Sequence, residues 1–206
     1  TAKEIKITLE KYNLELASSW HSTFFLTKSF KEESENIKNK CSLLSKAGAR
    51  VVNIAECSSS IHNKIKTALS FKPICSEDQY SILADSLNKA GEICQSFGLN
   101  LAFHHHIGTY IQNHNEIEKI LSMRDSKLVN LCADTGHLYF AGVDPIDFFQ
   151  KHIDRMKHIH FKDIRHDVFN NINFKEESFL SLVLKGVFTV PGNGCIEFVK
   201  IAKTIK

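Results

Sequence analysis

The sequence predicts an α/β fold built on a parallel sheet. Short apolar runs typical of strands alternate along the chain with longer amphipathic stretches typical of helices. Each connection between successive strands is too long for a hairpin turn, so we expect parallel strands joined by crossover helices. Ligands bind such sheets at the carboxyl ends of the strands, and polar side chains gather at those positions in this chain.

The first 56 residues are expected to contain two strands. A helix over residues 3–12 is followed by a strand near residues 14–18, which ends at Ser19-Trp20-His21. A helix over residues 30–47 ends at Gly48, because glycine commonly terminates helices. A β-branched strand over residues 50–55 then ends at Glu56.

The pattern continues to the end of the chain. The remaining predicted elements are a helix at 76–97, a strand at 99–103, a helix at 114–123, a strand at 129–133, a helix at 145–152 and a strand at 156–161. Residues 162–185 have weak periodicity, which predicts a long loop with a short helix near 178–184. The Pro/Gly-rich run 188–194 is either a loop over the mouth of the pocket or a turn before the last helix.

Composition indicates one domain over residues 1–206. The chain is 43% hydrophobic and 24% charged, which is ordinary for a globular protein. The net charge of +3 is spread without a basic block, so nucleic acid is not an expected partner. No apolar run approaches the ~18 residues of a membrane span, so a membrane is not expected either.

The six cysteines are widely spaced and form no C-x-x-C pair. They are Cys41, Cys57, Cys75, Cys94, Cys132 and Cys195. This spacing argues against a zinc ribbon and a compact disulfide framework, and it favours reduced thiols in a cytoplasmic protein. Cys132 lies inside an apolar run and is interpreted most simply as a small core residue.

Three adjacent histidines follow the third predicted strand. On an extended chain His104 and His106 share one face, while His105 points the other way. Imidazole is a common metal ligand and titrates near neutral pH, so His104 and His106 are candidate ligands or proton carriers. The alternative is a strand end rich in surface residues.

Asp134 directly follows the apolar strand 129–133. A carboxylate at that position must be paired, hydrogen-bonded or metal-bound to offset desolvation. The alternative is an ordinary helix N-cap or a turn residue before Gly136. His137 lies three residues further on and is expected to reach the same pocket.

The last clear strand carries His158 and His160 on one face, and Lys162 continues that face. One of these histidines is plausible as a buried structural residue, but both together favour a site. A carboxylate with imidazoles suits Mn²⁺, Co²⁺, Fe²⁺ or Zn²⁺ better than Ca²⁺. Glu56 and His21, at the ends of two other strands, are weaker candidates that are equally well explained as loop residues.

Several motifs in order resemble the inosose dehydratases, a family of myo-inositol catabolism within the xylose isomerase-like barrel superfamily. The matching runs are Val52-Asn-Ile-Ala-Glu-Cys57, Ser60-Ile-His62, His104-His-His-Ile-Gly-Thr109, Asp134-Thr-Gly-His-Leu-Tyr-Phe-Ala-Gly142 with Asp144-Pro145, His158-Ile-His-Phe-Lys-Asp-Ile-Arg165 and Gly186-Val-Phe-Thr-Val-Pro-Gly-Asn-Gly-Cys-Ile196. Together they are far more specific than any one alone. The resemblance implies a (β/α)₈ TIM barrel.

The resemblance also implies an activity. It is the dehydration of a cyclitol, 2-keto-myo-inositol (scyllo-inosose), to 3D-trihydroxycyclohexane-1,2-dione through a metal-stabilised enediolate, with Mn²⁺ or Co²⁺; glutathione is associated with the family. Asp134 and His160 match the superfamily's metal-ligand motifs. The expected catalytic residues are His104, His106, His137 and Lys162, and the expected substrate contacts are Trp20, Glu56, His158 and Asp163. Acid and base roles among the histidines stay open.

Relative to the family, the chain corresponds to about five strands, the third to the seventh, and lacks counterparts of the first two and the last. Missing segments would come from a longer precursor or from another copy in a homo-oligomer. Two alternatives to the dehydratase remain. One is a sugar isomerase or epimerase on the same scaffold, and the other is a truncated remnant that binds metal weakly or not at all.

Overall fold

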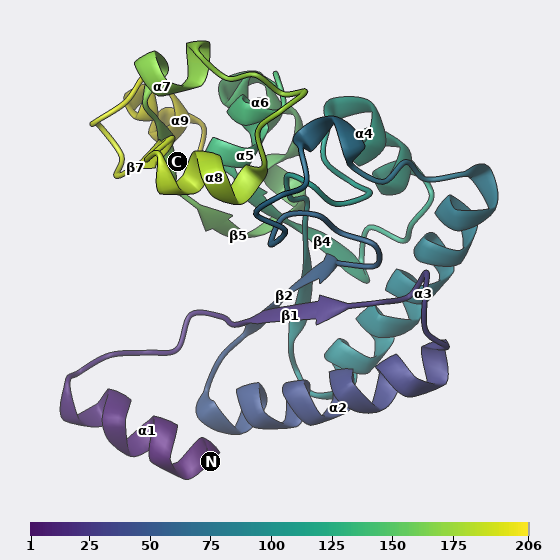
Figure 1. Ribbon diagram of the computed structural model, residues 1–206. Coiled ribbons are helices and arrows are strands. Elements are labelled where there is room, and N and C mark those ends of the chain that lie inside the picture. Colours follow the sequence, from purple (N-terminus) through teal and green to yellow (C-terminus); the bar gives the residue numbers. More distant parts are fainter. Residues whose placement is uncertain (206) are drawn as a thin grey trace.

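The computed structural model describes residues 1–205 and contains a five-stranded parallel sheet (Figure 1). Its strands are β1 (Trp20–Thr23), β2 (Val51–Glu56), β3 (Asn100–His104), β4 (Val129–Asp134) and β5 (Met156–His160). Neighbours in the sheet are neighbours in sequence, in the order β1-β2-β3-β4-β5. This order, with helices between the strands, confirms the predicted α/β class.

The first strand lies later in the chain than predicted. The apolar run at 14–18 does not pair; instead β1 begins at Trp20, which is in register with Asn53 of β2. Leu14 is 59% exposed, so the residue that suggested a buried strand contributes nothing to the core. Pairing with β2 decided the position of β1, and local propensity did not.

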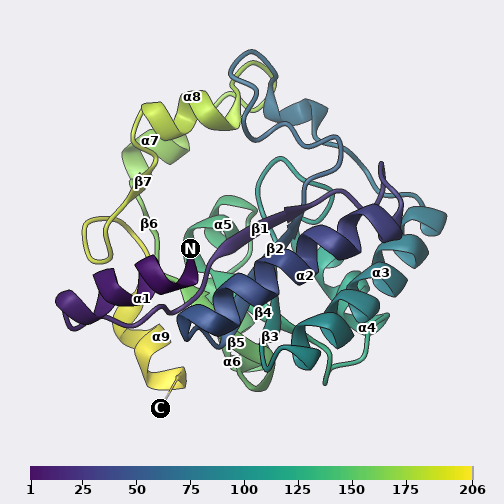
Figure 2. The same ribbon diagram turned by 90° about the horizontal axis from the view of Figure 1, so that it is seen from below.

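Two long helices lie along the sheet in both views (Figures 1 and 2). Both α2 (Phe30–Ala47) and α3 (Glu77–Ser96) begin at capping boxes, with Ser29 and Ser76 as N-caps. Gly48 ends α2 in the left-handed conformation at φ 93°, which confirms the predicted terminator. No helix within residues 1–205 is long and apolar enough to cross a membrane.

The other helices are short and connect or flank the strands. They are α1 (Ala2–Lys11), η1 (Leu69–Phe71), α4 (His114–Ser122), α5 (Thr135–Phe140), α6 (Pro145–His152), η2 (Ile153–Arg155), α7 (His166–Asn170), α8 (Phe179–Leu184) and α9 (Phe198–Thr204). The predicted helices at 3–12, 114–123, 145–152 and 178–184 correspond to α1, α4, α6 and α8.

Residues 162–185 hold more structure than the predicted loop. Two residues form β6 (Asp163–Ile164), which pairs antiparallel with β7 (Phe188–Thr189), and α7 follows β6 directly. Elements of two to five residues are too short to show periodicity, which explains why sequence patterns missed them. In Figure 1 this segment gathers at one end of the molecule, away from α2 and α3.

The sheet has two chemically different faces. Ile54, Phe103 and Leu131 belong to the main core, together with the helix residues Leu83 and Leu87. A separate small apolar layer contains Val51, Ala102 and Cys132. Because side chains alternate along a strand, this second face is also the face of Asn53, His104 and Asp134, two residues further along. We call it the inner face.

Gly91 allows α3 to approach the chain before β4. A Cβ atom at Gly91 would lie 2.6 Å from the carbonyl oxygen of Leu128, and backbone cannot yield as a flexible side chain would. Alanine favours helix by about 1 kcal/mol over glycine, whereas overpacking costs about 1–3 kcal/mol. Because the clash at Gly91 is with backbone, we take the upper part of that cost, about 2–3 kcal/mol, and expect Gly91→Ala to lower the free energy of unfolding by about 1–2 kcal/mol in urea titrations. A free energy of unfolding equal to or above that of the wild type would contradict this expectation. The control is Glu92→Ala, because Glu92 is exposed on the same helix.

Candidate metal centre and active site

The ends of β3, β4 and β5 bring three donor atoms together. Asp134 Oδ2 lies 3.5 Å from His104 Nε2 and 3.3 Å from His160 Nδ1. The two ring nitrogens, His104 Nε2 and His160 Nδ1, are themselves 3.0 Å apart. His137 Nε2, from α5, lies 4.0 Å from the same carboxylate oxygen, and Lys162 Nζ contacts it directly. These five residues form what we call the Asp134 cluster.

Asp134 has a structural role as well. Its Oδ1 accepts a hydrogen bond from the backbone N–H of His137 at 3.1 Å, which caps the amino terminus of α5. Its own N–H donates to His105 Nε2 at 3.4 Å. The helix N-cap that the sequence offered as one interpretation of Asp134 is thus present, while the other carboxylate oxygen faces His104, His160 and Lys162.

The cluster keeps Asp134 ionised. Complete burial opposes ionisation, but the electrostatic interaction with the nearby His137 ring, hydrogen bonds from His104 and His160, and the charge of Lys162 outweigh it. The pKa of Asp134 is consequently held well below its usual range. The result is a fixed negative charge at the ends of the strands.

Three imidazoles near this charge, those of His104, His106 and His137, are neutral at pH 7. Burial lowers the pKa of His104, and burial together with neighbouring imidazoles lowers those of His106 and His137 well below the ordinary value. The rings of His106 and His137 have centroids only 4.0 Å apart. A neutral His106 donates from Nδ1 to the carbonyl oxygen of Ile107 at 2.8 Å, which leaves its Nε2 as a proton acceptor.

Two predicted substrate-binding residues lie beside the Asp134 cluster. The Trp20 ring packs edge-on against His104 and His106, with centroids 5.1 Å and 5.7 Å away, and is 37% exposed. The His158 ring lies edge-on to His160 at 5.1 Å. Trp20 thus presents a partly exposed apolar surface beside the cluster.

Glu56 and Asp163, also predicted to bind substrate, are engaged elsewhere. Glu56 alternates with Asn53 onto the other face of β2, where it accepts hydrogen bonds from the backbone N–H groups of Phe25 and Ser58. Burial raises the pKa of Glu56 despite these bonds. Asp163 is fully buried and accepts from three backbone N–H groups, those of Ile164, Gly192 and Ile196. His21 lines a separate surface hollow beside α2.

Three contributors were not predicted. Asn53 Nδ2 lies 3.4 Å from His160 Nε2, and Cys132 Sγ lies 3.8 Å from His160 Nδ1. Thr135 joins two segments: its Oγ1 accepts from the Lys162 N–H at 3.0 Å and donates to the Lys162 carbonyl at 2.7 Å. The alternation of side chains along a strand places Asn53 and Cys132 on the inner face, so both could have been predicted from the sequence. No pattern in the sequence predicted the hydrogen bonds of Thr135.

The Pro/Gly-rich run contacts the cluster through Phe188. The Phe188 ring lies 5.4 Å from His137, and a Cβ atom on Gly136 would lie 3.0 Å from that ring. The same Cβ would come within 2.7 Å of Lys162 Cβ. The absence of a side chain at Gly136 thus lets Phe188 and Lys162 close over α5.

The donor set fits a divalent ion of the borderline type. Bond lengths of about 2.0–2.1 Å in a tetrahedral shell place nitrogen and oxygen ligands about 3.3 Å apart. The separations of 3.0, 3.3 and 3.5 Å among His104, Asp134 and His160 lie close to that value. Two overlapping triads have ligand atoms within 4.8 Å of one another, namely His104, Asp134 and His137, and His104, Cys132 and His160. One carboxylate with imidazoles matches Mn²⁺, Fe²⁺, Co²⁺ or Zn²⁺.

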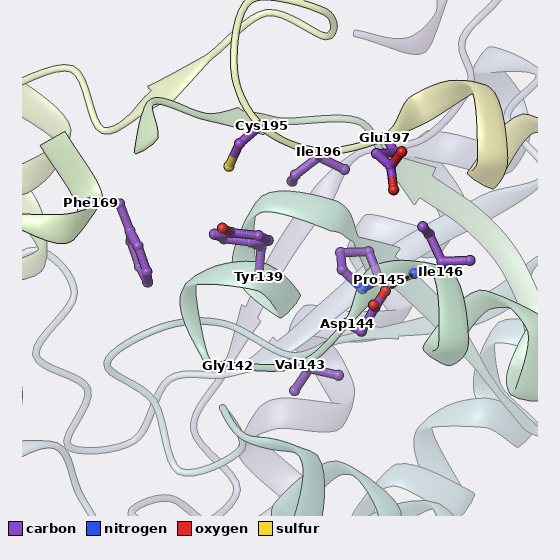
Figure 3. Close-up of a pocket in the computed structure, with 10 residues that line it drawn as sticks. All are labelled: Tyr139, Gly142, Val143, Asp144, Pro145, Ile146, Phe169, Cys195, Ile196 and Glu197. Carbon is purple, nitrogen blue, oxygen red and sulfur yellow. Dashed lines mark hydrogen bonds between the residues drawn. The ribbon is translucent and has the colours of Figure 1, made fainter. Parts of the chain in front are cut away.

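A cavity of about 390 Å³ lies elsewhere, between α5, α6 and the chain before α9 (Figure 3). It is lined by Tyr139, Gly142, Val143, Asp144, Pro145, Ile146, Phe169, Cys195, Ile196 and Glu197, none of which belongs to the Asp134 cluster. Its walls are mostly apolar, and Asp144 is occupied in capping α6. The ionised carboxylate of Asp134 and the neutral imidazoles of His104 and His137 lie in the Asp134 cluster, which is therefore the candidate site.

A parallel sheet with ligand-type side chains at the carboxyl ends of its strands is the arrangement found in barrel enzymes. The family model described as xylose isomerase-like TIM barrel matches residues 1–206, and the chain belongs to this family.

Curated relatives refine the assignment. An inosose dehydratase of Clostridium beijerinckii is 40% identical over 207 residues, covering 98% of this chain and 68% of that protein. An inosose dehydratase of Bacillus thuringiensis is 43% identical over 195 residues, covering 94% of this chain and 65% of that protein. The resemblance found in the motifs is confirmed. The chain spans about two thirds of the length of these relatives.

Solved structures agree on the fold. The probable 3-DHS dehydratase AsbF of Bacillus anthracis superposes with a TM-score of 0.71 at 14% identity, covering 99% of this chain and 70% of that chain. The IolI protein, solved with a binding zinc atom, gives a TM-score of 0.68 at 14% identity, covering 100% of this chain and 69% of that chain. These likenesses confirm the TIM barrel fold.

Proposed function

We propose that the protein containing this chain is a hydro-lyase that dehydrates 2-keto-myo-inositol to 3D-trihydroxycyclohexane-1,2-dione. The observation that carries the proposal is the Asp134 cluster, in which the neutral imidazoles of His104 and His137 lie beside an ionised, buried carboxylate. The name of the relatives at 40–43% identity supports the same reaction over a sugar isomerase or epimerase on this scaffold.

The chemistry requires a base, an acid and a stabilised negative charge. The proton beside the ketone leaves to a base, the hydroxyl on the next carbon departs with a proton, and one water is lost in total. His106 is the candidate base, because its Nε2 holds a free lone pair at neutral pH. His137, 4.0 Å away between ring centroids, is placed to return a proton to the departing hydroxyl.

Asp134, His104 and His160 would hold the metal ion, for which we propose Mn²⁺ or Co²⁺. Such an ion supplies Lewis acidity for the ketone oxygen when it is bound. Lys162 adds a positive charge at the same place, beside Asp134. Trp20 offers an apolar wall for the carbon face of a cyclitol ring, and His158 extends the polar wall at His160. Three further points stay predictions. They are the requirement for glutathione, the assembly into a homo-oligomer and the cytoplasmic location.

The test is dehydration of 2-keto-myo-inositol, followed by the ultraviolet absorbance of the product. We expect turnover that disappears with a chelator and returns with Mn²⁺ or Co²⁺. The assay is run on residues 1–206 and on a protein extended to the length of its relatives. Absence of turnover in both, with metal bound, would refute the proposed reaction. Turnover in the extended protein alone would assign the activity to the longer protein and agree with the remnant alternative for 1–206.

A further inference from the structure

Cys132 lies on the inner face of β4, one layer deeper than Asp134. It is completely buried, and its Sγ lies 3.8 Å from His160 Nδ1, the nitrogen that also faces Asp134. Its other neighbours on that face are Val51 and Ala102. Burial between small apolar side chains explains a small residue here, but it does not require sulfur at the side of His160.

We propose that Cys132 supplies a thiolate ligand to the metal ion, together with His104 and His160. This inference rests on the proposed function in one respect, namely that the Asp134 cluster holds a divalent ion. The Cys132 thiolate adds a soft sulfur donor to ligand atoms that are otherwise nitrogen and oxygen. This sulfur makes the site selective for Co²⁺ and Zn²⁺ over Mn²⁺.

The distances support a common shell. With a metal–sulfur bond of about 2.3 Å and metal–nitrogen bonds of about 2.0–2.1 Å, tetrahedral geometry places sulfur and nitrogen about 3.5 Å apart. Cys132 Sγ and His160 Nδ1 are 3.8 Å apart, and His104 Nε2 and His160 Nδ1 are 3.0 Å apart. All three ligand atoms lie within 4.8 Å of one another. Asp134 Oδ2 lies 3.3 Å from His160 Nδ1, the same nitrogen that faces the sulfur.

Asn53 provides an independent observation in favour of Nδ1 as the ligand atom of His160. If Nδ1 binds metal, Nε2 must carry the hydrogen and needs an acceptor. Asn53 Nδ2 faces Nε2 at 3.4 Å, while Asn53 Oδ1 is buried and lacks a partner within residues 1–205. The oxygen and nitrogen of an amide are interchangeable by a 180° rotation, which would let Oδ1 accept from Nε2–H and satisfy both groups.

Formation of the bond replaces S–H by S–metal and releases the thiol proton to solvent. No oxidant or reductant is involved.

The experiment uses Co²⁺ as the probe, because a thiolate ligand gives a sulfur-to-cobalt charge-transfer band in the near ultraviolet. Metal-depleted wild type is expected to bind one Co²⁺ and to show this band, which Cys132→Ser should lose. Cys195→Ser is the matched control, since Cys195 lines the separate cavity, and it should keep the band. We expect Cys132→Ser to bind Zn²⁺ about 10–100-fold more weakly, with much less change for Mn²⁺.

The outcomes separate the two proposals. Bound Co²⁺ without the band would overturn the role of Cys132 and leave the metal site intact. No Co²⁺ bound by any variant would overturn both. If Cys132→Ser fails to fold, X-ray absorption of Zn²⁺-loaded wild type decides: a sulfur neighbour at about 2.3 Å, kept in Cys195→Ser, supports the inference, and only nitrogen and oxygen neighbours would refute it.

Discussion

Replacing Asp134 with asparagine should lower turnover about 10³-fold and weaken metal binding, because the exchange removes the only carboxylate of the Asp134 cluster. Asparagine is as good an N-cap as aspartate, so the hydrogen bond to the His137 N–H is kept and α5 should survive. The loss therefore reports the charge rather than the fold. The charge of Lys162 would also be left without its counter-charge.

Asp144→Asn is the matched control for this change. Asp144 caps α6 by accepting from the Ile146 N–H at 2.7 Å, as Asp134 caps α5, but it belongs to the separate cavity. Turnover of Asp144→Asn should stay near wild type. Turnover is measured with saturating metal, and metal affinity is measured separately by titration. Near-normal values for Asp134→Asn in both measurements would remove Asp134 from the chemistry.

A second large effect is expected at Asp163, on stability. Its fully buried carboxylate accepts from the N–H groups of Ile164, Gly192 and Ile196, at 2.8 to 2.9 Å. Alanine would leave three buried donors unpaired, at about 1–3 kcal/mol each. Some relaxation of the loop is expected, so we predict a loss of about 3–5 kcal/mol in the free energy of unfolding, measured in urea.

The comparison variants for Asp163 are Asp163→Asn and Asp167→Ala. The amide of Asp163→Asn keeps one acceptor oxygen, so its loss should be smaller. Asp167 is exposed in α7, and its removal should leave the urea midpoint unchanged. If Asp163→Ala instead keeps wild-type stability but raises the KM for substrate, the predicted substrate contact would be correct and the structural role wrong.

The parts of the fold that could be predicted are those with long patterns. The helices α2 and α3 carry caps, apolar spacing and glycine terminators over 18 and 20 residues, which fixes both type and limits. The strand β1 has four residues and is positioned by pairing with Asn53 and its neighbours, which a single segment cannot encode. The same holds for β6 and β7, at two residues each.

The candidate site was predictable where chemistry and strand ends coincide. His104 and Asp134 each follow an apolar run, His160 lies in the last predicted strand, and the structure brings the three within 3.0 to 3.5 Å. Asp163 and Glu56 also follow strand-like runs, but their partners are backbone N–H groups of loops. Those contacts depend on where distant loops fold back, which no local pattern reveals.

The two hydrogen bonds between Thr135 and Lys162 have a consequence for local unfolding. The Thr135 hydroxyl forms hydrogen bonds with both the N–H and the carbonyl of Lys162. The turn after β4 and the turn after β5 are therefore held together through one side-chain oxygen. Opening either turn must break the bonds of the other, which makes the two segments one cooperative unit. Binding of a metal ion to the Asp134 cluster would then slow hydrogen exchange in both segments together, although Thr135 and Lys162 are 27 residues apart in the chain.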